Sequence, residues 1–469
     1  MPVARPSSLG TIAVVVVLAL TVLVAAEVCR IPVQVSDSVG NLLQVQRQLL
    51  GDVFFSQFSN GAYVRPLLWS EFKLAYEMAR GHETVMFKAI HVTQLLLLAV
   101  LALRLMPVRS RVELTAAVLA VFVLFGLHTF DGLVREAFPI NSFLTIVLCV
   151  LAMIVLADGE PAVWRDVTAA TILTVALLTL ESGLLVAVAA VAAWLAGMRG
   201  VSAKAVAAIA VTAAAYLLLR TSVLHLGGPS LSERASGFGF RTLEPGELVA
   251  RFGSNPLPFY AYNVIASLAT VLFAEPRGGV WYAAHGVAAG DVWPSWLAIN
   301  VAASVLATGL LLCAIPGAAG RWRAGSAGRH DRLLLVAVTV LGANAVVSFA
   351  YTKDVIMSAG GACFALGVYA AAALLLSRRP RTSRAVYAAV ALALLLWPLR
   401  AAALPFRLEM QAARVQEEWR DVDGWLERQH VTVAGPEARA LVNRLRRSAL
   451  QAHPRPVEWT GWRSLLDLN

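Results

Sequence analysis

The stretch DVTAATILTVALLTLESGLLVAVAAVAAWLAGM, from Asp166 to Met198, decides the fold class. Its 33 residues contain one charged side chain besides the first, Glu181, which stands near the middle. As a single helix the stretch would be about 50 Å long, whereas the hydrocarbon core of a bilayer is about 30 Å thick. A carboxylate at the centre of a bilayer is also costly. The stretch therefore predicts two short membrane crossings that meet at Glu181.

Apolar runs of about 20 residues, the length of a spanning helix, recur along the chain. The nine clear ones are 11–29, 87–106, 112–128, 139–157, 202–223, 293–315, 333–351, 357–377 and 384–402. The run 259–274 is apolar but short and has prolines on both sides, so it need not span. Because 58% of the 469 residues are hydrophobic and only 14% are charged, the chain is predicted to be an all-α polytopic membrane protein.

The positions of the basic residues predict the orientation of the chain in the membrane. Lys and Arg outnumber Asp and Glu by 39 to 29, a balance that in a soluble protein would be compatible with nucleic acid. Here the basic residues gather in four short loops between apolar runs, at 104–111, 199–204, 321–332 and 378–384. The positive-inside rule places such loops in the cytoplasm. The partner expected from this pattern is a lipid bilayer, and no nucleic-acid partner is expected.

The charged loops also determine the number of crossings. If the N-terminus is cytoplasmic, all four loops face the cytoplasm only when 259–274 adds an even number of crossings, as a re-entrant or interfacial helix would. The total is then eleven, and the C-terminus is extracytoplasmic. A rival count takes 166–198 as one long tilted helix and 259–274 as a full span, which moves Arg199 and Lys204 outside.

Both counts give an integral cytoplasmic (inner) membrane protein, and the first apolar run is interpreted as a retained anchor rather than a cleaved signal peptide. Both also place three polar pieces on the outer face: the loop 30–86, the loop 128–139 and the tail. The first loop predicts amphipathic helices over 41–50 and 70–80. We therefore divide the chain into a transmembrane domain, 1–403, and a short helical extracytoplasmic tail, 404–469.

Several classes of site are not predicted. The four cysteines, Cys29, Cys149, Cys313 and Cys363, have neither CxxC spacing nor nearby His pairs, so neither a disulfide framework nor a zinc site is indicated. The sequence has no GxGxxG or Walker loop, which argues against a nucleotide-driven pump. The cofactor is unknown: a divalent cation stays possible, although no dedicated metal motif is present.

Three kinds of side chain near the predicted outer face are candidates for chemistry, and each has a structural alternative. Asp37, just beyond the first span, is placed to act as a general base, or it is a solvated carboxylate or a helix N-cap. Glu181 has a functional role at membrane depth or ties two helices together. His91 and His128 are candidates for contact with substrate or a metal; the structural alternative is that they are hydrogen-bonded residues of the fold.

The outer-loop motifs resemble those of a known superfamily. Gly61-Ala62-Tyr63-Val64-Arg65-Pro66-Leu67-Leu68, followed by Phe87-Lys88-Ala89-Ile90-His91, resembles the first outer loop of GT-C glycosyltransferases, where Y-R-P-L-like and F-H-x-x-N-like elements follow an acidic residue. The nearest branches are the protein O-mannosyltransferase-like enzymes, the transmembrane and tetratricopeptide-repeat mannosyltransferases and their bacterial relatives. No repeat array follows here.

Further landmarks of that superfamily have counterparts in the same order. They are Leu127-His128-Thr129-Phe130-Asp131 with Arg135, Leu180-Glu181-Ser182-Gly183, Tyr216-Leu217-Leu218-Leu219-Arg220 and Glu418-Trp419-Arg420-Asp421. The chain differs from the family pattern at three places: a single Asp stands beside Ser36 instead of an acidic pair, Val64 interrupts Y-R-P-L, and Leu180 replaces a lysine.

The resemblance implies a GT-C-like bundle that transfers a sugar from a polyprenyl-phosphate donor to an extracytoplasmic acceptor, which is a protein, a lipid or a polysaccharide. It implies that Asp37 is the catalytic base. The residues expected to bind donor or substrate are Arg220, Lys353, Glu181, His128 and Asp131, and those expected to position the outer loop are Tyr63, Arg65 and His91.

Two of these residues have simpler explanations. Arg220 holds the donor phosphate or reaches toward the membrane interface from the end of a span, and Lys353 holds phosphate or pairs with Asp354. The alternative function is a non-catalytic polytopic membrane protein, either a transporter in which Glu181 lines the substrate path or a scaffold.

Overall fold

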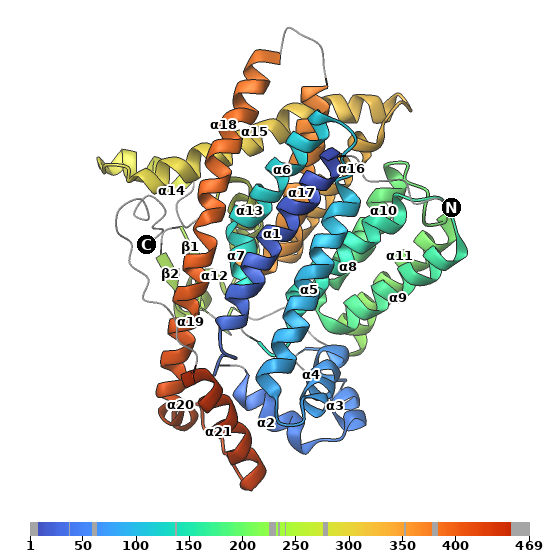
Figure 1. Ribbon diagram of the computed structural model, residues 1–469. Helices are drawn as coiled ribbons and strands as arrows, with labels where there is room; N and C mark the ends of the chain where they lie inside the picture. Colours follow the sequence, from blue (N-terminus) through green and yellow to red (C-terminus); the bar gives the residue numbers. More distant parts are fainter. Residues whose placement is uncertain are drawn as a thin grey trace.

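The computed structural model describes residues 8–36, 38–58, 63–136, 138–224, 231–232, 235–239, 241–274, 280–350, 353–377 and 383–451. These residues form a bundle of α-helices with one short hairpin, in which β1 (Ser236–Phe238) pairs antiparallel with β2 (Arg241–Leu243) (Figure 1).

The helices of the membrane bundle and the outer loop, up to the hairpin, are α1 (Ser8–Arg30), α2 (Val39–Arg47), α3 (Leu50–Ser56), α4 (Pro66–Ala79), α5 (Glu83–Leu105), α6 (Arg111–Gly126), α7 (His128–Arg135), α8 (Ser142–Ala157), α9 (Val163–Thr179), the 3-10 turn η1 (Glu181–Gly183), α10 (Leu184–Leu195), α11 (Ala203–Leu218) and the π-helical turn η2 (Leu219–Val223). The helices after the hairpin are α12 (Pro245–Phe252), α13 (Leu257–Phe273), α14 (Val280–Ala289), α15 (Ser295–Arg323), α16 (Arg329–Val347), the 3-10 turn η3 (Asp354–Met357), α17 (Ser358–Leu376), α18 (Ser383–Ala402), α19 (Leu404–Arg420), α20 (Val422–Arg428) and α21 (Pro436–Gln451).

Within the described residues, seven helices are long and apolar enough to cross a membrane: α1, α5, α11 with η2, α15, α16, η3 with α17, and α18 with α19. The pair α6 and α7, bent by 58°, gives an eighth. Three further apolar helices are shorter, at Ser142–Ala157, Glu181–Leu195 and Leu257–Phe273. The chain is thus a helical membrane protein. The count of eleven crossings stays a prediction, because it needs short helices such as α8, α9 and α10 to cross as well.

The stretch 166–198 is two helices that meet at Glu181, as the sequence predicts. The turn is tight, because a Cβ on Gly183 would lie 2.3 Å from the backbone of Ala176. The far ends of α9 and α10 also lie together: the Ser202 amide donates to Oδ1 of Asp166 at 2.8 Å. The chain therefore returns to the side from which it came. The rival interpretation of this stretch as one long helix is wrong.

Helix α17 forms the centre of the bundle. In its apolar stretch 94% of the residues are buried, and it contacts α6, α8, α15 and α16. Its sequence is rich in Ala and Gly, and small residues let helix backbones approach closely. A Cβ on Gly361 would lie 2.2 Å from Oγ1 of Thr129, so this glycine allows α7 to pack directly on α17.

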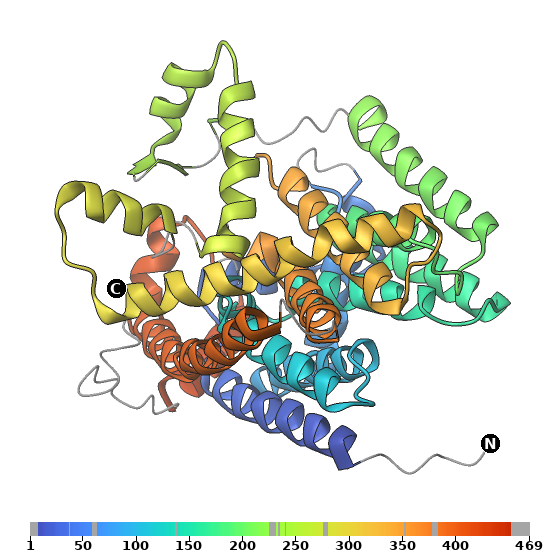
Figure 2. The ribbon, with the colours of Figure 1, turned by 90° about the horizontal axis from the view of Figure 1, so that it is seen from above.

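Helices α13 and α15 lie across their neighbours. Figures 1 and 2 both show α15 running across the bundle at a large angle to α1, α5 and α18. Oγ1 of Thr308, on α15, donates to the carbonyl of Leu272, on α13, at 2.6 Å. At its other end α13 is bonded to the segment that follows α16, where Nδ2 of Asn263 donates to the carbonyl of Phe349 at 2.9 Å. The apolar run 259–274 thus packs against the two consecutive helices α15 and α16.

The basic loops share one end of the bundle. Arg329 donates to the carbonyl of Leu105 at 3.0 Å and pairs with Asp158 at 2.7 Å, and Arg332 donates to the carbonyl of Gly197 at 3.0 Å. These bonds bring together the loops 104–111, 199–204 and 321–332. Of the fourth loop, 378–384, residues 378–382 lie outside the described residues.

The outer loop and the tail meet at the opposite end (Figure 1). Nε1 of Trp419, on α19, donates to the carbonyl of Val33 at 2.6 Å, and Nε of Arg444, on α21, donates to the buried carboxylate of Glu83 at 3.2 Å. The amphipathic helices differ from those expected in their ends. The first stops at Arg47 and α3 follows it, and the second begins at Pro66, because proline favours the first turn of a helix.

The hairpin of α9 and α10 predicts the side on which the next loop lies. A reporter enzyme that is active only outside the cytoplasm should be active when it is fused after Ser254, since α11 crosses once more after the hairpin. A fusion after Asn469 should also be active, and one after Ser326, in a basic loop, should be silent. Silence of the Ser254 fusion would contradict the two crossings of 166–198.

Candidate functional site

Two arginines from distant parts of the chain converge on Glu181. Its Oε2 lies 2.8 Å from Nη2 of Arg65, at the start of α4, and its Oε1 lies 3.0 Å from Nη1 of Arg220, in η2. Nε of Arg65 donates to both carboxylate oxygens at 3.2 Å. One carboxylate therefore connects the first outer loop, the α9–α10 turn and the end of α11.

Two tyrosines complete this group. The hydroxyl of Tyr216 lies 3.5 Å from Nη1 of Arg220, and the guanidinium of Arg65 lies 4.4 Å from the centre of the Tyr63 ring. We call Tyr63, Arg65, Glu181, Tyr216 and Arg220 the Glu181 cluster. Cation–π contact and hydrogen bonding hold both guanidinium groups in place.

The local backbone explains how Glu181 and Arg220 reach each other. Leu180 is extended, with φ −148° and ψ 155°, so α9 stops there and Glu181 begins the 3-10 turn that leads into α10. At Leu219 the backbone of α11 changes to π geometry, which widens the turn that carries Arg220. Such turns are rare in proteins, and those that occur often lie at functional sites.

The Glu181 cluster carries an excess of positive charge. Two guanidinium groups face one carboxylate, and the side chains of Arg65, Glu181 and Arg220 keep 28%, 23% and 14% of their exposed surface. The cluster is therefore accessible to a ligand and yet partly removed from water, where charge interactions are stronger. These properties favour an oxyanion such as phosphate, which arginine binds through paired N–H donors.

A second set of charges holds α7 in place. Oδ1 of Asp131, which is 3% exposed, lies 2.9 Å from Nε of Arg135, and its Oδ2 lies 3.4 Å from Nη1 of Arg407, on α19. Nζ of Lys353 lies 3.0 Å from Glu136, so its salt-bridge partner is not Asp354. Among the described residues, no ion pair connects Asp131 or Lys353 with the Glu181 cluster. Their contacts tie α7 to the tail and to the start of α17.

Both candidate histidines are buried. His91, on α5, is 4% exposed, and His128, at the start of α7, is 5% exposed. Throughout the described part of the chain, no three His, Cys, Asp or Glu side chains are arranged to hold a metal ion.

Asp37 lies outside the described residues. The residues before it lie against the tail: the Val35 amide donates to Oε2 of Glu418 at 3.3 Å, and the Val33 carbonyl is bound by Trp419. Ser38, which follows it, is completely buried. The role of Asp37 as a base therefore stays a prediction.

Glu71, on α4, is a carboxylate that sequence analysis missed. It lies on the same helical face as Leu68 and Ala75, which pack toward the core, and burial raises its pKa to about 7. Within the described residues, no basic side chain lies within ion-pair distance of it. The signal was present in the sequence, because a helix that begins at Pro66 turns position 71 toward its apolar face.

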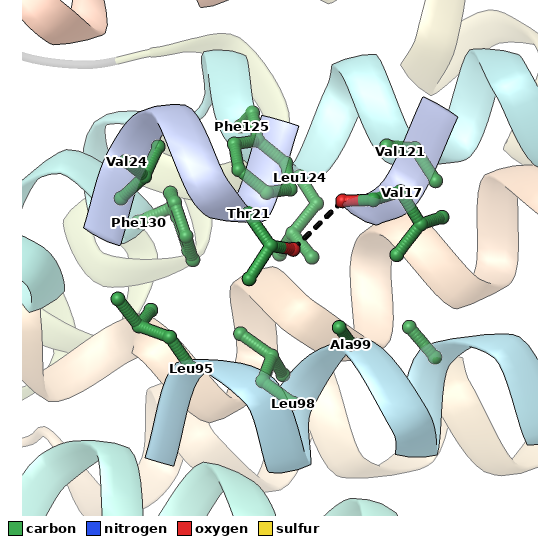
Figure 3. Close-up of a pocket in the computed structure, with 11 residues that line it drawn as sticks. Val17, Thr21, Val24, Leu95, Leu98, Ala99, Val121, Leu124, Phe125 and Phe130 are labelled. Carbon is green, nitrogen blue, oxygen red and sulfur yellow. Dashed lines mark hydrogen bonds between the residues drawn. The ribbon is translucent and has the colours of Figure 1, made fainter. Parts of the chain in front are cut away.

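An apolar crevice lies between α1, α5, α6 and α7 (Figure 3). Its lining includes Val17, Leu98 and Phe125, and the one hydroxyl on its wall, that of Thr21, donates to the carbonyl of Val17 at 2.8 Å. Its volume is about 10 Å³, near the smallest space that holds a water molecule. The crevice is therefore a packing feature of these helices.

Comparison of the chain with protein-family models, curated proteins and solved structures gives no match in any of the three. The chemistry of the residues themselves is what bears on function.

Replacing Glu71 by Gln should stabilise the protein at pH 8 and have little effect at pH 4.5. The pKa of Glu71 rises from 4.5 to about 7 on folding, so the folded state binds more protons than the unfolded state between these values. The stability that this proton contributes is present below pH 4.5 and is lost as the pH rises through 7. The gain at pH 8 should be on the order of 2 kcal/mol, measured by unfolding in detergent.

The exposed Glu160, in the loop before α9, provides the control. Glu160→Gln should leave the pH dependence of unfolding as it is in the parent protein. If Glu71→Gln also followed the parent protein at both pH values, the burial of this carboxyl would be contradicted.

Proposed function

We propose that the protein is a membrane glycosyltransferase of GT-C type, which transfers a sugar from a polyprenyl-phosphate donor to an extracytoplasmic acceptor. The observation that carries the proposal is the Glu181 cluster, with two guanidinium groups for one carboxylate where three outer segments meet. The prenyl chain of such a donor would lie in the bilayer, and its phosphate would lie at the membrane boundary.

The cluster would act on the leaving group. Arg220 and Arg65 bind the phosphate oxygens of the donor, and Glu181 offsets the repulsion between the two guanidinium groups and keeps both in place before the donor arrives. Negative charge builds up on the phosphate as the bond to the sugar breaks. Positive groups that are already positioned stabilise this charge in the transition state. Tyr63 and Tyr216 keep the arginines in position.

The acceptor side requires a base. A hydroxyl oxygen of the acceptor attacks the anomeric carbon, the bond from this carbon to the phosphate oxygen breaks, and polyprenyl phosphate leaves with the electron pair. The hydroxyl proton passes to the carboxylate of Asp37. The outer loop that carries Asp37 also carries Arg65, which brings the base and the phosphate site onto one segment.

The proposed location is the cytoplasmic (inner) membrane, with the N-terminus in the cytoplasm and the tail outside. The support is the gathering of three basic loops at one end of the bundle and the positive-inside rule. The Glu181 cluster then faces away from the cytoplasm, as the outer loop and the tail do.

The test uses matched pairs of variants. Arg220→Met and Asp37→Asn should each lower transfer from a radiolabelled polyprenyl-phosphate sugar in membranes at least 100-fold. The controls are Arg439→Met, in an exposed part of α21, and Asp52→Asn, in an exposed part of α3. Both should transfer at the parent rate. Full transfer by Asp37→Asn would remove its role as base, and full transfer by Arg220→Met would remove the phosphate site.

The alternative, a transporter, is favoured by one observation. The span made of α6 and α7 is broken by a bend of 58°, and buried polar side chains follow the break, among them Thr129 and Asp131. Broken helices form the substrate sites of many transporters. A transporter would move solute across proteoliposomes without a lipid donor, and Glu181→Gln would abolish that flux. Transfer activity without flux would exclude this alternative.

A further inference from the structure

Arg400 is a cation buried inside the bundle. It lies near the end of α18, only 3% of its surface is exposed, and it packs between α6 and α15. Gly126, on α6, makes room for it, because a Cβ there would lie 3.2 Å from Cβ of Arg400 and 2.9 Å from the ring of Trp397. The guanidinium carbon lies 4.2 Å from the centre of that ring.

The charge of Arg400 has no carboxylate partner among the described residues. Nη1 donates to Oγ of Ser304 at 2.8 Å and contacts the carbonyl of Asn300 at 3.4 Å. Both acceptors are neutral. The next cation along the same helical rod, Arg407, is paired with Asp131. A guanidinium removed from water without a counter-charge is costly, so an ionisable residue inside a membrane bundle is by default a candidate for a functional site.

The unsatisfied atoms around Arg400 are all donors. Nη2 of Arg400 and Nδ2 of Asn300 are buried and have no hydrogen-bond partner among the described residues. Oγ of Ser304 is occupied as an acceptor, which leaves its own proton to donate. The three groups come from α15 and α18, which contact each other. Two buried donors without hydrogen-bond partners, one of them on a cation, suit an anion and do not suit a metal ion.

We propose that Arg400, Asn300 and Ser304 form a second anion site, which binds a phosphate group. The position of Arg400 favours a lipid headgroup as the source. Arg400 lies two residues before the end of the span 384–402 that the sequence predicts, where a spanning helix of about 20 residues leaves the hydrocarbon core. Its neighbour Leu399 keeps 39% of its surface exposed. Free phosphate would use the same donors.

The site is separate from the Glu181 cluster, because α11 and α18 lie on different sides of the bundle in Figures 1 and 2. It does not depend on the proposed transfer reaction.

Binding can be measured without any transfer assay. Purified protein, stripped of lipid in a non-ionic detergent, is titrated with short-chain phosphatidylglycerol, with short-chain diacylglycerol and with inorganic phosphate. The readout is the unfolding temperature, together with the fluorescence of Trp397 compared with a Trp397→Phe variant. The phosphate-bearing ligands should raise the unfolding temperature saturably, and diacylglycerol should not. A response to the lipid alone assigns the site to headgroups, and a response to inorganic phosphate assigns it to the free ion.

Three variants test the residues. Asn300→Ala removes a donor that has no partner, so it should fold normally and bind the phosphate ligand about tenfold more weakly. Arg400→Gln should abolish binding, and Arg439→Gln, in the exposed part of α21, should bind as the parent protein does. The proposal is overturned if the parent protein responds to no phosphate ligand, or if Asn300→Ala binds it with unchanged affinity. The second result would leave Arg400 with a packing role only.

Discussion

Lipid offers the backbone no hydrogen bonds, and this constraint governs the whole molecule. A chain can cross a bilayer as helices, and any interruption of a helix must be satisfied by other groups. The Glu181 cluster lies at two such interruptions, the α9–α10 turn and the π turn that ends α11. Asp131 and His128 follow a third, the bend between α6 and α7. The positions that break the helical pattern are therefore also those where charged side chains can meet.

Charged side chains have different partners at the two ends of the bundle. At the basic end, Arg165, Arg329 and Arg332 donate to the carbonyls of Leu156, Leu105 and Gly197. These carbonyls belong to the last turns of helices or the residues after them, which lack partners within the helix. At the opposite end, arginines pair with carboxylates of other segments, as Arg444 does with Glu83. The first pattern binds the carbonyls at helix ends and joins neighbouring loops, and the second joins the outer loop to the tail.

The two proposed anion sites differ in what neutralises them. In the Glu181 cluster a carboxylate of the protein already lies between the arginines, and the side chains are partly exposed. A ligand there has to compete with Glu181, which suits a substrate that binds and leaves. Arg400 is buried and has only neutral partners. A ligand there would supply the missing charge, which suits a group that stays bound.

The sequence by itself determined the helical membrane class, the break at Glu181 and the grouping of basic loops, because these depend on local hydrophobicity, on helix length and on charge near the ends of spans. It could not show that Glu181 meets Arg65, which is 116 residues away, or that Lys353 pairs with Glu136. It also gave no sign that Arg400 is buried without a carboxylate partner among the described residues. Those facts depend on which helices pack against one another and at what height, and only the tertiary structure decides this. Hydrophobicity drives each helix into the bilayer. Because it is nearly the same for every helix, it does not determine which helices pack against each other.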